Sequence, residues 1–100
     1  MARKSKALIQ KATDDYIEGV MELFPGATIE VSQRAFDGFD VWVRILAPRT
    51  ILESEDMAER RMLKADLSIR ISDETGVNIT STLEDKSLLA APVLDAEGKE

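Results

Sequence analysis

Apolar residues recur at three- and four-residue intervals in the first quarter of the chain, which is the spacing of one stripe along a helix. The residues on this stripe are Ile9, Ala12, Tyr16, Val20, Leu23 and Phe24. Pro25-Gly26 ends the pattern, because proline cannot continue a helix and glycine accepts the left-handed conformation of helix ends. We therefore predict a helix from about residue 4 to residue 24. Gly19 lies inside this helix, which indicates that another backbone approaches it closely.

Apolar and polar residues alternate in the next segment, and alternation is typical of strands. A three-residue loop at 36–38, with Gly38 in the left-handed conformation, aligns the apolar faces of two antiparallel strands. A two-residue turn would place those faces on opposite sides. The pairs in the favoured register are Ile29–Ile45, Val31–Val43 and Ala35–Phe39 on one face, and Glu30–Arg44, Ser32–Trp42 and Arg34–Asp40 on the other.

Residues 65–75 allow two interpretations. The alternation of Leu67, Ile69 and Ile71 with polar residues predicts a strand, followed by a turn and a second hairpin with residues 77–83. Alternatively, a helix runs from Ser54 to Thr75 and ends at Gly76. Such a helix is apolar on two sides and needs a second covering surface, such as a dimer partner. The two stripes are Ala58, Met62, Ala65 and Ile69, and Leu63, Leu67 and Ile71.

These elements predict an α+β fold, in which the N-terminal helix and a second helix pack on an antiparallel sheet of three to four strands. The element order is αββαββ, or αββαβ if the long helix forms. We expect residues 1–85 to form a single domain and residues 86–100 a C-terminal tail with a disordered end, whose apolar stretch 88–94 docks.

The order helix, hairpin, helix, strand resembles that of two small α+β families, the BolA-like and the KH-like RNA-binding domains. The resemblance covers the order of elements only. The chain has no G-x-x-G loop with flanking basic residues and no histidine, so no functional residue is carried over from either family.

The inventory of side chains excludes several kinds of site. The chain contains no histidine and no cysteine, which excludes zinc-type metal sites, thiol nucleophiles, disulfides and Ser-His triads. No loop has a phosphate-binding spacing of glycines. We therefore predict no catalytic residue, cofactor site or metal site. No apolar run approaches the roughly 18 residues of a membrane span, and the lack of cysteine fits a cytoplasmic protein.

Charge is distributed unevenly along the chain. The 13 basic and 19 acidic residues give a net charge of −6, so the chain as a whole repels phosphate backbones and nucleic-acid binding is disfavoured. The first eleven residues nevertheless carry four basic side chains and no acid. An RNA-associated factor that uses this N-terminus with Arg60, Arg61 and Lys64 is therefore one alternative function. A small enzyme or enzyme subunit based on carboxylates is a second.

The preferred hypothesis is a small non-enzymatic module for protein interaction or self-association, with a homodimer as one form. Tryptophan and arginine are enriched at interface hot spots, and the hairpin register places Arg34, Trp42 and Arg44 on the polar face of the sheet. The second group of candidate interaction residues is the apolar stripe formed by Leu63, Leu67 and Ile71.

Overall fold

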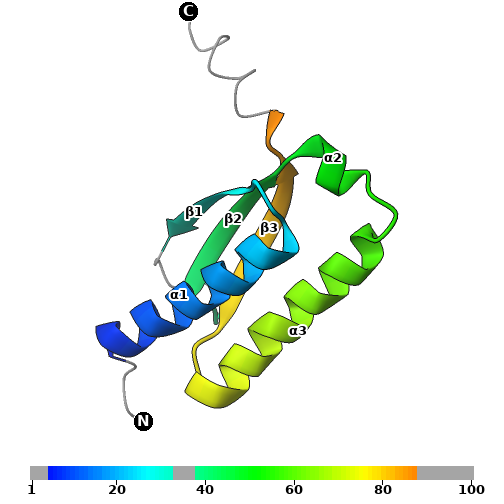
Figure 1. Cartoon of the computed structure of the whole chain (residues 1–100). Helices are drawn as coiled ribbons and strands as arrows, with labels where there is room; N and C mark the ends of the chain where they lie inside the picture. Colours follow the sequence, from blue (N-terminus) through cyan, green and yellow to red (C-terminus); the bar gives the residue numbers. More distant parts are fainter. Residues whose placement is uncertain (1–4, 33–37, 88–100) are drawn as a thin grey trace, which may run out of the picture.

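The computed structural model describes residues 5–32 and 38–87. Two long helices lie side by side on one face of a three-stranded sheet (Figure 1). In chain order the elements are α1 (Lys6–Leu23), β1 (Thr28–Ser32), β2 (Val41–Ala47), α2 (Arg49–Leu52), α3 (Met57–Thr75) and β3 (Ile79–Asp85). The α+β class and the order αββαβ are therefore confirmed, with the short α2 as an added turn before the long helix.

Helix α1 follows the predicted stripe. The hydroxyl of Ser5 caps it by accepting a hydrogen bond from the backbone N–H of Leu8 at 3.1 Å, which satisfies one of the free donors of the first turn. The buried side chains of the stripe face the sheet, and Phe24 follows the last turn. Gly26 then turns the chain into β1 with a φ of +83°, a conformation that glycine adopts without strain.

The hairpin register is confirmed where the structure describes both strands. Strands β1 and β2 pair antiparallel, with Ile29 opposite Ile45 and Glu30 opposite Arg44. Gly38 has the predicted positive φ, +82°. The predicted pairs that involve Arg34 and Ala35 lie outside the described residues.

The prediction of a wholly antiparallel sheet is wrong for its third strand. The strand order is β1-β2-β3, and β3 runs parallel to β2, with Val41 opposite Ile79 and Ala47 opposite Asp85. A parallel pair needs a crossover connection, and α2 with α3 provides it by returning the chain to the starting end of β2. The sheet is therefore mixed.

The second hairpin is also a wrong prediction, because residues 65–75 continue α3. Leu67 and Ile71 are four residues apart, so they point to the same side of a helix and both are buried. Gly76 ends the helix in the left-handed conformation, with φ +79°, and donates its N–H to Ser72 O. The alternating pattern that predicted a strand is satisfied here by one buried helical side and by Ile69 on the opposite, exposed side.

The contact at Gly19 differs from the sequence expectation. A Cβ atom on Gly19 would lie 2.5 Å from Leu67 Cδ2, so the close neighbour is a leucine side chain of α3 and not a backbone. The missing side chain lets α1 and α3 pack closely. Val31 departs as well, because its place on the apolar face of the predicted hairpin favours burial, whereas it is exposed near the end of the edge strand β1.

Candidate functional site

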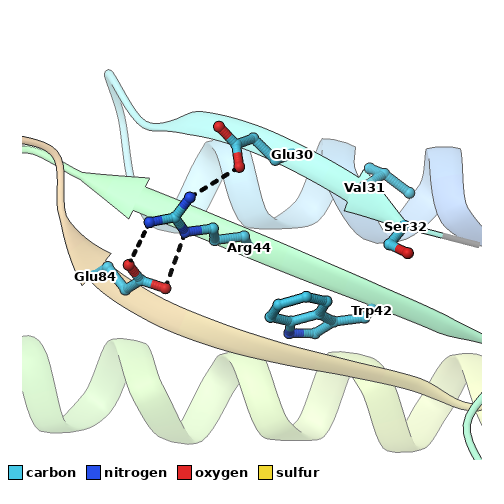
Figure 2. Close-up of a pocket in the computed structure, with 6 residues that line it drawn as sticks. All are labelled: Glu30, Val31, Ser32, Trp42, Arg44 and Glu84. Atoms are coloured by element: carbon cyan, nitrogen blue, oxygen red, sulfur yellow. Dashed lines mark hydrogen bonds and ion pairs between the residues drawn. The ribbon is translucent and has the colours of Figure 1, made fainter. Parts of the chain in front are cut away.

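The face of the sheet opposite the two helices carries the first group of predicted site residues. Trp42 is 37% exposed and borders a shallow groove of about 440 Å³ (Figure 2). The lining residues of this groove are Glu30, Val31, Ser32, Trp42, Arg44 and Glu84. Leu46, further along the same face of β2, is fully buried, so the open part of the face surrounds Trp42 and Arg44.

Arg44 is held by carboxylates from both neighbouring strands. Its Nε and Nη2 donate to the two oxygens of Glu84 at 3.0 and 2.8 Å, and its Nη1 donates to Glu30 Oε1 at 3.1 Å (Figure 2). These hydrogen bonds raise the pKa of Arg44, and those from Arg44 are the main reason that the pKa of Glu84 lies below its usual value. Because its guanidinium nitrogens all donate to these carboxylates, Arg44 links the three strands and does not present an unpaired charge.

This ion pair predicts how stability responds to acid. The pKa of Glu84 is lower in the folded than in the unfolded chain, so the stabilisation is present above the ordinary pKa of 4.5 and is lost as pH falls through the folded value. We expect Glu84→Gln to make the loss of stability between neutral and acid pH shallower, measured by denaturant midpoints across that range.

Glu55→Gln is the matched control, because Glu55 is an exposed carboxylate without an ion pair among the described residues. Asp56 and Asp85, whose pKa values are also lowered, keep part of the acid response in both variants. Identical pH profiles for the wild type and Glu84→Gln would contradict the prediction.

Arg34, the third candidate on this face, lies outside the described residues. The structure does bring Trp42 and Arg44 together on one face, as their spacing predicted. Glu84 of β3 joins them, and no local sequence pattern predicted this contact.

The second group of candidates lies between the helices. Leu67 and Ile71 are buried in the core against α1, whereas Leu63 is 43% exposed at the edge of that contact. Leu63 and Leu67 border a groove of about 470 Å³ between the antiparallel helices α1 and α3, which Gly19 and Leu23 also line.

The opposite stripe of α3 is the one that remains uncovered. Met62 is 63% exposed and Ile69 is 58% exposed, more than any other large apolar side chain in residues 5–32 and 38–87. Ala58 and Ala65 lie on the same stripe and are also exposed. Helical spacing had shown this stripe, but the candidate interaction residues were chosen from the other one.

The three basic residues of α3 do not form a shared basic patch. Arg60 pairs with Asp56 at 3.1 Å and also donates to the backbone oxygen of Leu23. Lys64 is half-buried and donates to Ser81 Oγ at 2.8 Å, and only Arg61 is exposed. The geometry of these side chains therefore adds nothing in favour of RNA binding.

Three polar residues that the sequence did not predict as a group meet in the interior. Ser81 Oγ on β3 accepts hydrogen bonds at 2.8 Å from the hydroxyl of Tyr16 on α1 and from Lys64 Nζ on α3. Burial lowers the pKa of Lys64 and raises that of Tyr16. Neither Ser81 nor Lys64 lines the groove at Trp42 or the groove between the helices. The trio therefore ties both helices to the sheet.

A general acid at neutral pH needs a raised pKa, whereas the pKa values of Asp56, Glu84 and Asp85 are shifted downward, so these three carboxylates do not suit that role. In residues 5–32 and 38–87 no three acidic side chains converge on a point that could hold a metal ion. No helix in these two ranges is long and apolar enough to cross a membrane.

Comparison with protein-family models, with curated proteins and with solved structures finds no match to this chain.

Proposed function

We propose that the protein is a non-enzymatic interaction module that self-associates through the outer stripe of α3, which consists of Ala58, Met62, Ala65 and Ile69. The observation that supports this proposal is the exposure of Met62 and Ile69, at 63% and 58%, on one side of one helix. Apolar surface gathered in this way marks interaction sites more often than apolar residues scattered singly do. In keeping with the absence of cysteine, we place the module in the cytoplasm.

The spacing of the outer stripe suits a partner helix. Its residues follow one another by four, three and four positions, which is the apolar seam of a short coiled coil. The two alanines allow a second helix to approach closely, and the flexible Met62 fills the remaining space. The seam spans fewer than two heptads, so we expect association to be weak and to depend on concentration.

Charges beside the seam favour a parallel arrangement of two copies. Glu59, Asp66 and Asp73 lie along one flank, and Arg61 lies on the other. In an antiparallel pair of α3 helices the acidic flanks would face each other and repel. In a parallel pair Arg61 of one copy lies across from Asp66 of the other.

Light scattering of the purified protein across a wide concentration range tests the proposal. We expect the mean mass to rise with concentration for the wild type and to remain that of a monomer for Met62→Gln/Ile69→Gln. Met21→Gln is the matched control, because Met21 is 41% exposed on α1, outside the stripe, and should leave association unchanged. A wild-type monomer at every concentration would overturn the proposal.

A further inference from the structure

The groove between α1 and α3 lies on a different side of α3 from the outer stripe and presents an apolar floor. Leu63, Leu67 and Leu23 line it, and the side chain of Leu67 lies over Gly19, where α1 carries no side chain. The groove continues past Ile71 as a second hollow of about 280 Å³. Leu63, 43% exposed, provides apolar surface for a ligand to cover.

The rim of the groove is acidic. On α1 it is formed by Asp15, Glu18 and Glu22, and on α3 by Asp66 and Glu74, with Arg70 as the single basic residue of the lining. Only Asp15 has an ion pair, with Lys11 at 3.2 Å. The other four carboxylates make none with any described residue, so their charge remains available to a partner.

We infer that this groove binds a basic amphipathic helix of another protein. Two packed antiparallel helices leave a furrow into which a third helix fits with its apolar side down. The α3 side of the furrow runs from Leu63 to Glu74, about 18 Å at 1.5 Å per residue, which is room for roughly three helical turns. Lysine and arginine side chains beside the partner's apolar stripe then reach the carboxylates of both rims.

The acidic rim of the groove determines that the partner helix carries positive charge. Four unpaired carboxylates against one arginine repel an acidic helix and attract a basic one, and the net charge of −6 on the whole chain adds to this selection at long range. The inference does not rest on self-association, because the outer stripe and the apolar floor of the groove lie on different sides of α3, although Asp66 flanks both.

The test uses a labelled 18-residue helical peptide of leucine and lysine, with leucines along one face, and a second peptide with glutamate in place of every lysine. Fluorescence anisotropy with the full chain should show binding of the lysine peptide that weakens as salt is raised, and no binding of the glutamate peptide.

Matched variants locate the binding site. We expect Glu18→Gln/Glu22→Gln to weaken binding of the lysine peptide by roughly fivefold, from about half a kcal/mol for each exposed pair lost. Glu59→Gln/Asp73→Asn removes two charges from α3 outside the groove and should change the affinity less than twofold. Leu63→Gln should weaken binding at high salt as well, because it removes apolar contact.

Three results would overturn the inference: no binding of the lysine peptide at low salt, an equal loss in both double-charge variants, or full affinity in Leu63→Gln. An equal loss would mean that the peptide is attracted only by the overall charge. Met62→Gln/Ile69→Gln should bind the peptide normally even where it abolishes self-association, so this proposal and the proposed function fail separately.

Discussion

Ile45→Ala is expected to lower the free energy of unfolding by about 3–4 kcal/mol, the largest effect we anticipate for a single substitution in this protein. Ile45 is fully buried on the central strand, opposite Ile29 on β1 and Leu83 on β3. Truncating it leaves a cavity that strands on both sides and the helices above cannot fill without moving.

Trp42→Ala is the matched comparison, three residues earlier on the opposite face of the same strand. Truncating a buried tryptophan to alanine lowers the free energy of unfolding by about 3–5 kcal/mol. Because Trp42 is 37% exposed, we expect a loss of about 1 kcal/mol. Urea denaturation followed by circular dichroism measures both variants, since the second removes the only tryptophan. Equal losses would show that Trp42 is covered in solution.

Leu67→Ala should lower the free energy of unfolding by about 2–3 kcal/mol. It should also turn the effect of Gly19→Ala from destabilising to stabilising. With Leu67 present, a Cβ atom added at position 19 would lie 2.5 Å from Leu67 Cδ2 and would force the leucine side chain or the helix to shift. Without the leucine that conflict is gone, and alanine at position 19 gains up to about 1 kcal/mol from its higher helix propensity.

A double-mutant cycle of Gly19→Ala and Leu67→Ala, measured by chemical denaturation of the four proteins, checks this reversal. The coupling free energy should favour the double variant by at least about 1 kcal/mol, as is typical of residues in contact. If Gly19→Ala has the same effect in both backgrounds, the glycine is not required by the packing of α1 against α3.

The hairpin was predictable because the alternation of apolar residues and the pairing of opposite charges indicate the same register. Alternating apolar positions allow only registers that keep both apolar faces together, and the pairing of Glu30 with Arg44 then followed without further assumption. Residues 65–75 lacked such agreement. Leu67 and Ile71 satisfy a strand with period two as well as a helix with contacts four residues apart, so local pattern did not decide between them.

The candidate sites were predictable only where they are local. Trp42 and Arg44 lie two residues apart on one strand and therefore share a face. Glu84 joins them because β3 is parallel to β2, and Tyr16, Lys64 and Ser81 meet only once both helices are placed on the sheet. The sequence showed two apolar stripes on α3, but which of them the domain covers depends on where α1 lies, and this was not predictable from local pattern.

The parallel pairing of β3 with β2 has a consequence for synthesis on the ribosome. Strand β2 has one neighbour, β1, as soon as the hairpin forms, but the other edge of its apolar sequence Val-Trp-Val-Arg-Ile-Leu-Ala stays unpaired until residues 79–85 emerge. More than thirty residues separate the two strands, so the whole of α3 must be synthesised before β3 can pair with β2. A nascent or truncated chain that ends within α3 therefore exposes an unpaired, aggregation-prone strand edge. We expect chaperones to bind the nascent chain at that stage of translation.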